Sequence, residues 1–266
     1  MIPISHNRFI GILFGICLVV LVTFPIPSKA LESLGASEDT ADIIVGCLYP
    51  MSGRAGVLGR DSVVGIRLAL QYIEQQRSPT LPRLRVLLGD TKSKRSTAVT
   101  IAKRFVEEER ATFLCGVVNS SVAIQVTEIA ASTGAFFVGT DHASSRLTDE
   151  FFHDRYFRVT NDTRQSMTAG ALFIRDYFDD HLKKKPLRIS YLGPDYEYGY
   201  QVWADFREAL NKLGVDYEIA GTLWPRLSEP DYSHYINELI RQKPDLVVNS
   251  LWGGDFVAFV TQATDT

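Results

Sequence analysis

Residues 43–73 read IIVGCLYPMSGRAGVLGRDSVVGIRLALQYI. The first seven residues are almost wholly apolar, and a glycine-rich turn separates them from Val63, Ile66 and Leu70, which recur at the spacing of one helix face. The stretch therefore predicts a buried strand that leads through a turn into an amphipathic helix. A strand without alternating polar residues is typical of a parallel sheet that has helices on both faces.

The same alternation of strand and helix continues along the chain and restarts after Thr160. We therefore predict an α/β fold with two doubly wound, Rossmann-like parallel-sheet lobes, at 42–160 and 161–266, joined near Thr160. The second lobe shows three obvious strands against five in the first, so we expect it to be incomplete and to expose an apolar edge. Beyond the first strand, the predicted strands are 84–90, 112–118, 135–139, 156–160, 187–193, 215–221 and 245–251.

The N-terminus has the layout of a secretory signal. Arg8 precedes an apolar run at 9–24, and small residues at 28–30 suit signal peptidase. We predict a cleaved signal peptide over 1–30 and a periplasmic protein. A retained membrane anchor is the alternative, although the run is shorter than the ~20 apolar residues that a spanning helix needs. Residues 31–41 are small and polar without periodicity, and we expect a disordered leader there.

The composition and net charge bear on whether the chain binds nucleic acid. The chain has 266 residues, a net charge of −3 and 45% hydrophobic residues, which is ordinary for a globular protein. A mildly acidic total without a long basic run argues against nucleic acid as a partner.

Cys47 and Cys115 each lie within an apolar run, so we expect buried free thiols. An oxidising compartment would permit a bridge between them, and the sequence leaves that alternative open. Neither cysteine has a second ligand at zinc spacing, and the histidines show no paired arrangement. We expect no metal and no cofactor.

The sequence lacks the motifs of the enzymes that use a doubly wound sheet. No G-x-G-x-x-G turn follows the first strand, and neither a P-loop nor a G-x-S-x-G elbow occurs. Ser120, Asp141 and His142 could form a triad on paper, but two sequence neighbours rarely point at one nucleophile. We therefore predict no catalytic residues and no enzymatic activity.

Four stretches, in order, resemble successive blocks of the periplasmic leucine/isoleucine/valine-binding proteins. These are solute receptors of ABC importers with a type I periplasmic-binding fold, and the similarity runs from 42 to 262. In that family two lobes close on a ligand across a hinge of three crossings, of which this sequence supplies one, near Thr160. The four stretches are 43–73, GVVNSSVAIQVTEIAASTGAFFVGTDHASSRLT at 116–148, YFRVTNDTRQSMTAGALFI at 156–174 and YEYGYQVWADFREALNKLGVDY at 196–217.

The resemblance implies a solute-binding protein of an ABC importer. Its ligand would be a branched-chain or other amino acid, or a similar small amphipathic solute, and its partner would be an ABC permease in the inner membrane. We expect a monomer. The alternatives are a ligand-sensing ectodomain that the N-terminal segment anchors in the membrane, and a non-functional fragment of such a receptor.

Ligands of open α/β sheets lie beyond the carboxyl ends of the strands, where helix N-termini point. Ser120 and Ser121 open one such helix. They could cap it, and they could also bind the carboxylate of an amino acid with backbone N–H groups of the first turn. The resemblance favours the second interpretation, because Ser120 matches a serine that binds this carboxylate in the family.

Other candidates follow four further strands. Asp141 is a candidate counter-charge for a ligand ammonium or a cap of its turn, and the resemblance implies that Ala143 replaces a ligand-binding threonine. Tyr198 matches a tyrosine that lines the closed cleft, or it is a surface aromatic. Trp252 could cover the ligand or stack on a cation, or pack against the next helix. Leu58 matches a pocket position that is aromatic in some relatives.

Overall fold

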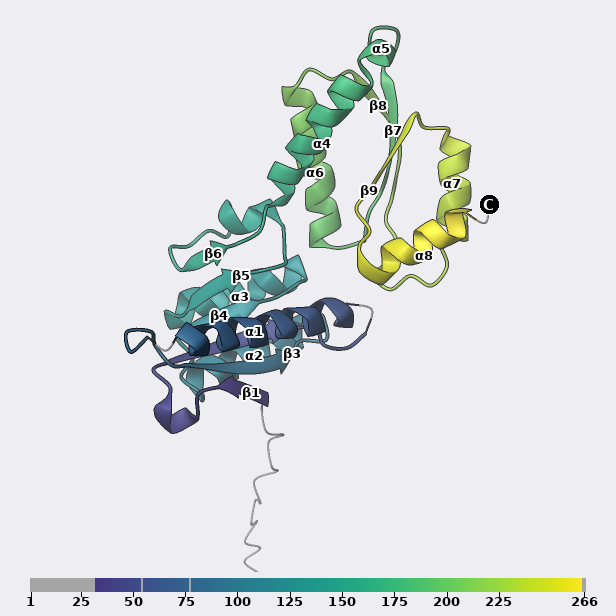
Figure 1. The fold of residues 1–266 in the computed structure, drawn as a ribbon. Helices are drawn as coiled ribbons and strands as arrows, with labels where there is room; N and C mark the ends of the chain where they lie inside the picture. Colours follow the sequence, from purple (N-terminus) through teal and green to yellow (C-terminus); the bar gives the residue numbers. More distant parts are fainter. Residues whose placement is uncertain (1–31, 54, 77, 265–266) are drawn as a thin grey trace, which may run out of the picture. The chain divides into compact units, whose positions relative to one another are not determined.

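The computed structural model describes residues 32–53, 55–76 and 78–264. The signal peptide predicted over 1–30 lies outside these residues. The described part contains two sheets, and the chain passes from the first to the second between Arg158 and Thr163 (Figure 1). Nowhere in the described residues is a helix long and apolar enough to cross a membrane.

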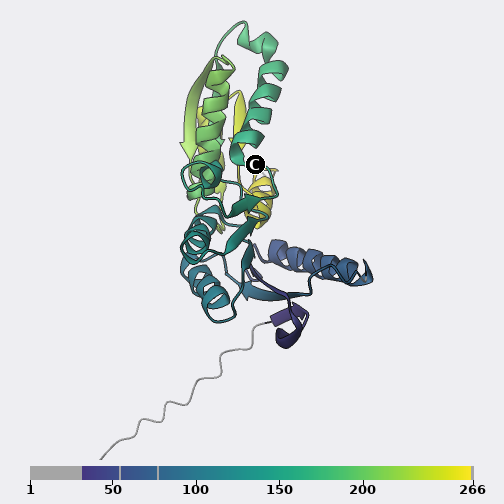
Figure 2. The same ribbon diagram turned by 90° about the vertical axis from the view of Figure 1, so that its left-hand side faces the viewer.

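The first sheet, sheet A, has six strands in the order β1-β3-β2-β4-β5-β6. Strands β2 to β6 run parallel, as their apolar sequences predict, and β1 is antiparallel to β3. One helix, α1, covers one face, and α2 and α3 cover the other (Figure 2). The elements are β1 Glu32–Gly35, β2 Ile43–Tyr49, α1 Gly56–Gln76, β3 Leu84–Asp90, α2 Arg95–Glu107, β4 Phe113–Gly116, α3 Ser120–Thr133, β5 Phe136–Gly139 and β6 Tyr156–Arg158.

The disordered leader predicted at 31–41 is wrong for the residues that the structure describes. Glu32–Gly35 pairs with β3 along the edge of sheet A, and a short 3-10 helix, η1, follows at Glu38–Thr40. The Ala36 N–H donates to the Leu84 carbonyl at 2.8 Å, which extends the pairing. The backbone of β1 pairs with an edge of β3 that would otherwise be unpaired, and Leu34 packs against the apolar cluster of sheet A. A lack of hydrophobic periodicity therefore did not mean a lack of structure.

The second sheet, sheet B, has the three strands that the sequence predicts, all parallel, in the order β8-β7-β9. Helices α4 and α6 pack on one face around Tyr191 and Phe206, and α7 and α8 pack on the other around Leu192 and Tyr232. The elements are α4 Thr163–Tyr177, α5 Asp179–Leu182, β7 Leu187–Leu192, α6 Glu197–Lys212, β8 Tyr217–Leu223, α7 Ser233–Gln242, β9 Leu246–Asn249 and α8 Gly253–Thr264.

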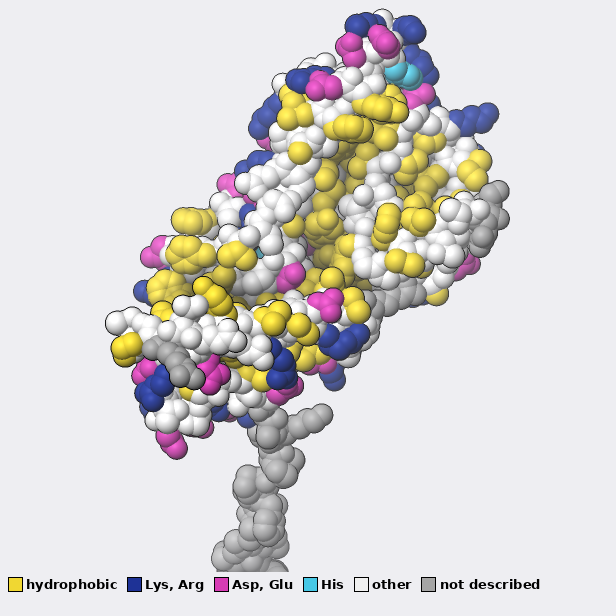
Figure 3. All heavy atoms as spheres, in the orientation of Figure 1, with side chains coloured by type: hydrophobic (Ala, Val, Ile, Leu, Met, Phe, Trp, Pro, Cys, Tyr) yellow, Lys and Arg dark blue, Asp and Glu magenta, His cyan; other side chains and the backbone are white. Residues whose placement is uncertain are grey.

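Apolar side chains remain exposed at several elements. On edge strand β9, Val247 is 38% exposed, in agreement with the apolar edge that we expected for this sheet. Apolar side chains also gather over α1 and β6 on the face shown in Figure 3. The exposed residues there are Val57, Val64, Leu68 and Tyr72 on α1, and Phe152, Phe157 and Val159 at and beside β6.

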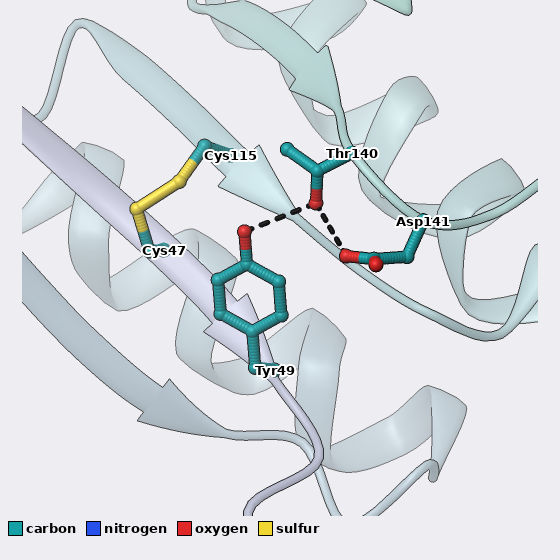
Figure 4. Close-up of a disulfide and its surroundings, with 5 residues drawn as sticks. All are labelled: Cys47, Tyr49, Cys115, Thr140 and Asp141. Atoms are coloured by element: carbon teal, nitrogen blue, oxygen red, sulfur yellow. Dashed lines mark hydrogen bonds between the residues drawn. A yellow bond between two sulfur atoms is a disulfide. The ribbon is translucent and has the colours of Figure 1, made fainter. Parts of the chain in front are cut away.

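The two cysteines of the described chain form a disulfide, so the free thiols that we expected are a wrong prediction (Figure 4). Cys47 in β2 and Cys115 in β4 are direct neighbours in the register of the parallel pair, with Cα atoms 4.5 Å apart. Cβ atoms at such positions point to the same face of the sheet, which brings the sulfurs together. The sequence showed two apolar strands but not that they were adjacent.

Candidate functional site

A cavity of 270 Å³ lies at the carboxyl ends of strands from both sheets. It is close to the size of a small-ligand site. Hollows of 370 and 380 Å³ beside Leu84 and Phe113 are larger, but they lie at the amino ends of β3 and β4. Ligands of open α/β sheets bind at the carboxyl ends, so we take the smaller cavity as the candidate site. It is lined by Leu58, Val118, Asp141, Ala143, Tyr196, Tyr198 and Trp252.

Three aromatic residues form one wall of this cavity. Trp252, which follows β9, donates its indole N–H to the Tyr196 hydroxyl at 3.0 Å. The Tyr196 and Tyr198 rings, at the start of α6, have centroids 6.2 Å apart. Burial raises the pKa of both tyrosines above the ordinary value, so the hydroxyls stay protonated and neutral. The wall is thus uncharged, and the hydrogen bond to Tyr196 fixes the indole plane.

Asp141 supplies the single charged side chain of the lining, and a chain of hydrogen bonds orients it (Figure 4). The Thr140 hydroxyl donates to the Asp141 carboxylate at 2.6 Å. Since that uses the only proton of Thr140, the Tyr49 hydroxyl must be the donor in its 3.0 Å contact with Thr140 Oγ1. Burial raises the pKa of Tyr49, which keeps its proton in place. Gly116 has φ +98° and leaves room for the Tyr49 ring, which a Cβ atom would approach to 2.8 Å.

His142 anchors the segment that carries Asp141 and Ala143. It is fully buried, with Nδ1 2.8 Å from the Val117 carbonyl and Nε2 2.8 Å from the Tyr156 hydroxyl. A carbonyl only accepts, so Nδ1 carries the proton and Nε2 accepts from Tyr156. Burial lowers the pKa of His142 to about 4, which keeps the ring neutral. The neutral ring therefore ties the end of β4 to the turn after β5.

The backbone at the end of β4 is strained beside this histidine. Val117 has φ +68°, a conformation that a β-branched residue adopts only at a cost of about 1–3 kcal/mol. Its N–H donates to the Leu48 carbonyl at 2.7 Å, and its carbonyl accepts from His142. These bonds hold the strained residue, which sends Val118 into the cavity wall. Strain of this kind is typical of functional sites.

Ser120 and Ser121 are not among the cavity-lining residues, unlike the other five residues that the sequence suggested, which are Leu58, Asp141, Ala143, Tyr198 and Trp252. Ser120 is 1% exposed, and its Oγ accepts from the Ser144 N–H at 3.3 Å. Ser121 is half-buried at the start of α3. The helix is capped instead by Asn119, whose side chain accepts from the Val122 N–H at 3.2 Å. Ser120, the residue after this cap, thus supports the turn after β5 by accepting from the Ser144 N–H.

Glu197 joins the aromatic wall to the segment after Ala143. This residue opens α6 between the two cavity tyrosines, and its carboxylate accepts from Ser144 Oγ at 2.8 Å. It also accepts from Arg146 Nη1 at 2.7 Å, with 14% of the Glu197 side chain exposed. One carboxylate therefore connects the turn after β5, in sheet A, to the first turn of α6, beside sheet B.

Asp205, two turns further along α6, is a buried carboxylate that bonds to the segment after β5 and to the start of α4. It is 3% exposed and accepts from three donors, the Thr163 hydroxyl at 2.5 Å, the Ser145 hydroxyl at 2.8 Å and the Gln201 amide at 2.8 Å. Thr163 Oγ1 in turn accepts from the Ser145 N–H at 3.0 Å. A buried carboxylate is tolerated only when its acceptor sites are filled in this way.

Thr163→Val is expected to lower the free energy of unfolding by about 2 kcal/mol, because it takes a charge-assisted hydrogen bond from a buried carboxylate without changing side-chain shape. Urea unfolding at neutral pH measures the change. Thr100→Val, at an exposed position of α2, is the matched control and should change it by less than about 0.5 kcal/mol. Equal effects of the two substitutions would show that the hydrogen bond from Thr163 to Asp205 does not contribute to stability.

The triad that could be assembled on paper is not present. Both ring nitrogens of His142 are engaged by Val117 and Tyr156, and its ring is fully buried. The described residues also contain no group of His, Cys, Asp and Glu side chains that could hold a metal ion. Ser120, Asp141 and His142 therefore do not form a nucleophile–base pair.

Comparison with known proteins shows to which family the chain belongs. The family model described as periplasmic binding protein matches residues 42–266. The chain belongs to the periplasmic binding protein family. These proteins are extracytoplasmic, bind small molecules for ABC transporters and are not enzymes. As a periplasmic binding protein, the chain has the fold class predicted from its sequence, a type I periplasmic-binding fold.

Two curated relatives are Leu/Ile/Val-binding protein homologues of Brucella. Homolog 7 of Brucella suis biovar 1 is 23% identical over 240 residues, which cover 90% of this chain and 59% of the relative. Homolog 1 of Brucella abortus is 22% identical over 214 residues, which cover 80% of this chain and 54% of the relative. The chain thus spans less than two thirds of the length of these relatives.

Solved structures of the same fold include a solute-binding protein of an ABC transporter and a leucine-binding protein. A solute-binding protein from R. palustris in complex with benzoate superimposes with a TM-score of 0.73, 20% identity, and coverage of 84% of this chain and 59% of that one. The leucine-binding protein LivK from Thermotoga maritima gives a TM-score of 0.71 and 18% identity, over 84% of this chain and 60% of that one. At these identities, both superpositions show a shared fold.

Sequence reasoning overlooked two lining residues and the groups that support the site. Tyr196 stands in the same YEYG segment as Tyr198, so this aromatic pair before a helix was a usable signal. Val118 was hidden in an apolar run that we assigned to a strand. The partnerships of Tyr49 with Thr140 and of Glu197 with Ser144 span 91 and 53 residues, and no local pattern marks them.

Proposed function

We propose that this chain is an extracytoplasmic solute-binding protein of an ABC importer. It binds a branched-chain or other amino acid, or a similar small amphipathic solute, and presents it as a monomer to an inner-membrane permease. The observation that carries the proposal is the cavity at the carboxyl ends of strands from both sheets, whose lining is mainly apolar with one carboxylate. The periplasm is the proposed location, reached through the signal sequence at 1–30.

Four of the residues suggested by the sequence are the proposed ligand contacts, namely Asp141, Ala143, Tyr198 and Trp252. Ser120, which the sequence suggested as a ligand contact, is proposed instead to support the turn through Ser144. Tyr198 and Trp252 follow strands of sheet B, and Asp141 and Ala143 follow a strand of sheet A. A ligand that touches both groups favours the arrangement that brings them together, which is the requirement for a receptor that responds to occupancy.

The test is binding of a small-solute library by the purified chain, followed by thermal shift and then calorimetry. We expect at least one amino acid or similar solute to raise Tm, and Trp252→Ala to weaken its binding about tenfold or more through loss of the aromatic contact. Phe256→Ala, at an exposed aromatic of α8 outside the lining, is the matched control. If no solute in the library binds, or if the two variants lose affinity equally, the proposed site is wrong.

A further inference from the structure

The cavity has a charge pattern that narrows the class of solute. Its lining contains one carboxylate, at Asp141, and no Lys, Arg or His. The hydroxyls of Tyr196 and Tyr198 stay protonated, as described above. A ligand carboxylate placed here would meet a like charge without a balancing cation, which is unfavourable in a partly desolvated site.

The same lining provides what a cationic nitrogen requires. Ammonium groups bind favourably against the faces of Trp and Tyr rings and beside a carboxylate. The Trp252 indole is held in place by its bond to Tyr196 at 3.0 Å, so its face needs no reorganisation when a ligand arrives. The rest of the lining, Leu58, Val118 and Ala143, is apolar and suits a flat or aliphatic body.

Asp141 is oriented for this task by groups behind the cavity. Thr140 donates to one carboxylate oxygen, Oδ2, at 2.6 Å, and Tyr49 donates to Thr140 at 3.0 Å, so that both protons point toward the carboxylate (Figure 4). The remaining acceptor sites of the carboxylate are available to a donor in the cavity. Tyr49 is 3% exposed and belongs to the apolar cluster that includes the disulfide. Packing in this cluster therefore fixes the position of the Tyr49 hydroxyl, from which the two hydrogen bonds to Asp141 begin.

We propose that the solute carries a cationic nitrogen on an apolar or aromatic body, that Asp141 and the faces of Trp252 and Tyr198 receive this nitrogen, and that Thr140 and Tyr49 are positioning residues for Asp141. A free carboxylate on the solute is not required. The proposal rests on the proposed solute-binding function and adds the charge of the solute to it. It separates this chain from a receptor for simple carboxylates.

Four probes with one aromatic body test the proposal by calorimetry on the full chain: 2-phenylethylamine, L-phenylalanine, 2-phenylethanol and 3-phenylpropionate. We expect the first two to bind at least about tenfold more tightly than the last two, which is the size of one charge-assisted hydrogen bond. Asp141→Asn should weaken 2-phenylethylamine about tenfold and change 2-phenylethanol less than about twofold. Equal or tighter binding of 3-phenylpropionate would overturn the proposal, as would an Asp141→Asn variant that binds the amine unchanged.

The positioning role has its own readout. Thr140→Val should weaken the amine by roughly threefold to tenfold while leaving the alcohol unchanged, and Thr140→Ser, which restores the hydroxyl, should restore amine binding. A structural role alone would weaken both probes together. An equal loss for both probes in Thr140→Val would therefore remove Thr140 from the proposal.

The outcomes also separate this inference from the proposed function. If a library solute without a cationic nitrogen binds and Trp252→Ala weakens it, the solute-binding function stands and the cationic inference fails. If the four probes fail to bind but a cationic library solute binds and Asp141→Asn weakens its binding, the inference is supported, and the apolar part of the solute differs from the phenyl group of the probes. If neither probes nor library bind, the proposed function fails and the inference falls with it.

Discussion

Replacing Cys47 and Cys115 together by alanine is expected to lower the free energy of unfolding by about 4 kcal/mol. The disulfide closes a segment with a sequence separation of 68 residues, and a loop of that length loses considerable conformational entropy in the unfolded chain when it is closed. The two cysteines lie on adjacent central strands of sheet A, so the bridge also fixes the register of β2 against β4. Urea unfolding of the double variant and the unchanged chain, both without reductant, measures the difference.

A reductant provides the control for this prediction. Dithiothreitol should destabilise the unchanged chain toward the level of the double variant and should leave the double variant as it was. An unchanged midpoint of unfolding in the double variant would contradict the prediction. Because the disulfide packs in the same apolar cluster as Leu58, Val118 and Trp252, we also expect reduction to weaken ligand binding at the cavity.

Regular elements were predicted well where one local pattern controls them. The strand expected at 84–90 is β3 with the same bounds, because its apolar run ends at a polar turn on the carboxyl side. The strand expected at 112–118 is shorter, Phe113–Gly116, since Gly116 and Val117 both have positive φ and leave the extended conformation. The strand expected at 215–221 is shifted to Tyr217–Leu223, because the Val215 N–H still bonds to Leu210 at the end of α6.

Long-range pairing was the part that the sequence did not provide. The edge strand β1 has a single apolar residue, Leu34, and pairs through its backbone with β3, so side-chain periodicity carried no sign of it. The bond between Cys47 and Cys115 depends on strand order, which hydrophobic runs do not encode. The same holds for the site. Motif position identified Asp141, Tyr198 and Trp252 as lining residues, whereas burial of Ser120 depends on the turn that folds over it from Ser144.

His142 makes stability depend on pH below neutrality. Burial lowers its pKa from 6.5 to about 4 in the folded chain, so between those values the unfolded chain binds a proton that the folded chain does not. The contribution of His142 to the free energy of unfolding therefore rises with pH, by roughly 3 kcal/mol between about 4 and 6.5, and is constant above that. Urea unfolding at several pH values between 4 and 7.5 measures the profile.

Other groups titrate in the same window, so the informative quantity is the difference between the unchanged chain and His142→Gln. Glutamine can donate to Val117 and accept from Tyr156 without binding a proton, so the variant should lose the part of the slope that His142 contributes. His234→Gln, at an exposed position of α7, is the matched control for replacing a histidine by glutamine. Parallel profiles for the unchanged chain and His142→Gln would mean that the ring is not held neutral by burial. The turn that carries Asp141 and Ala143 would then need a different anchor, because a protonated Nε2 could not accept from Tyr156.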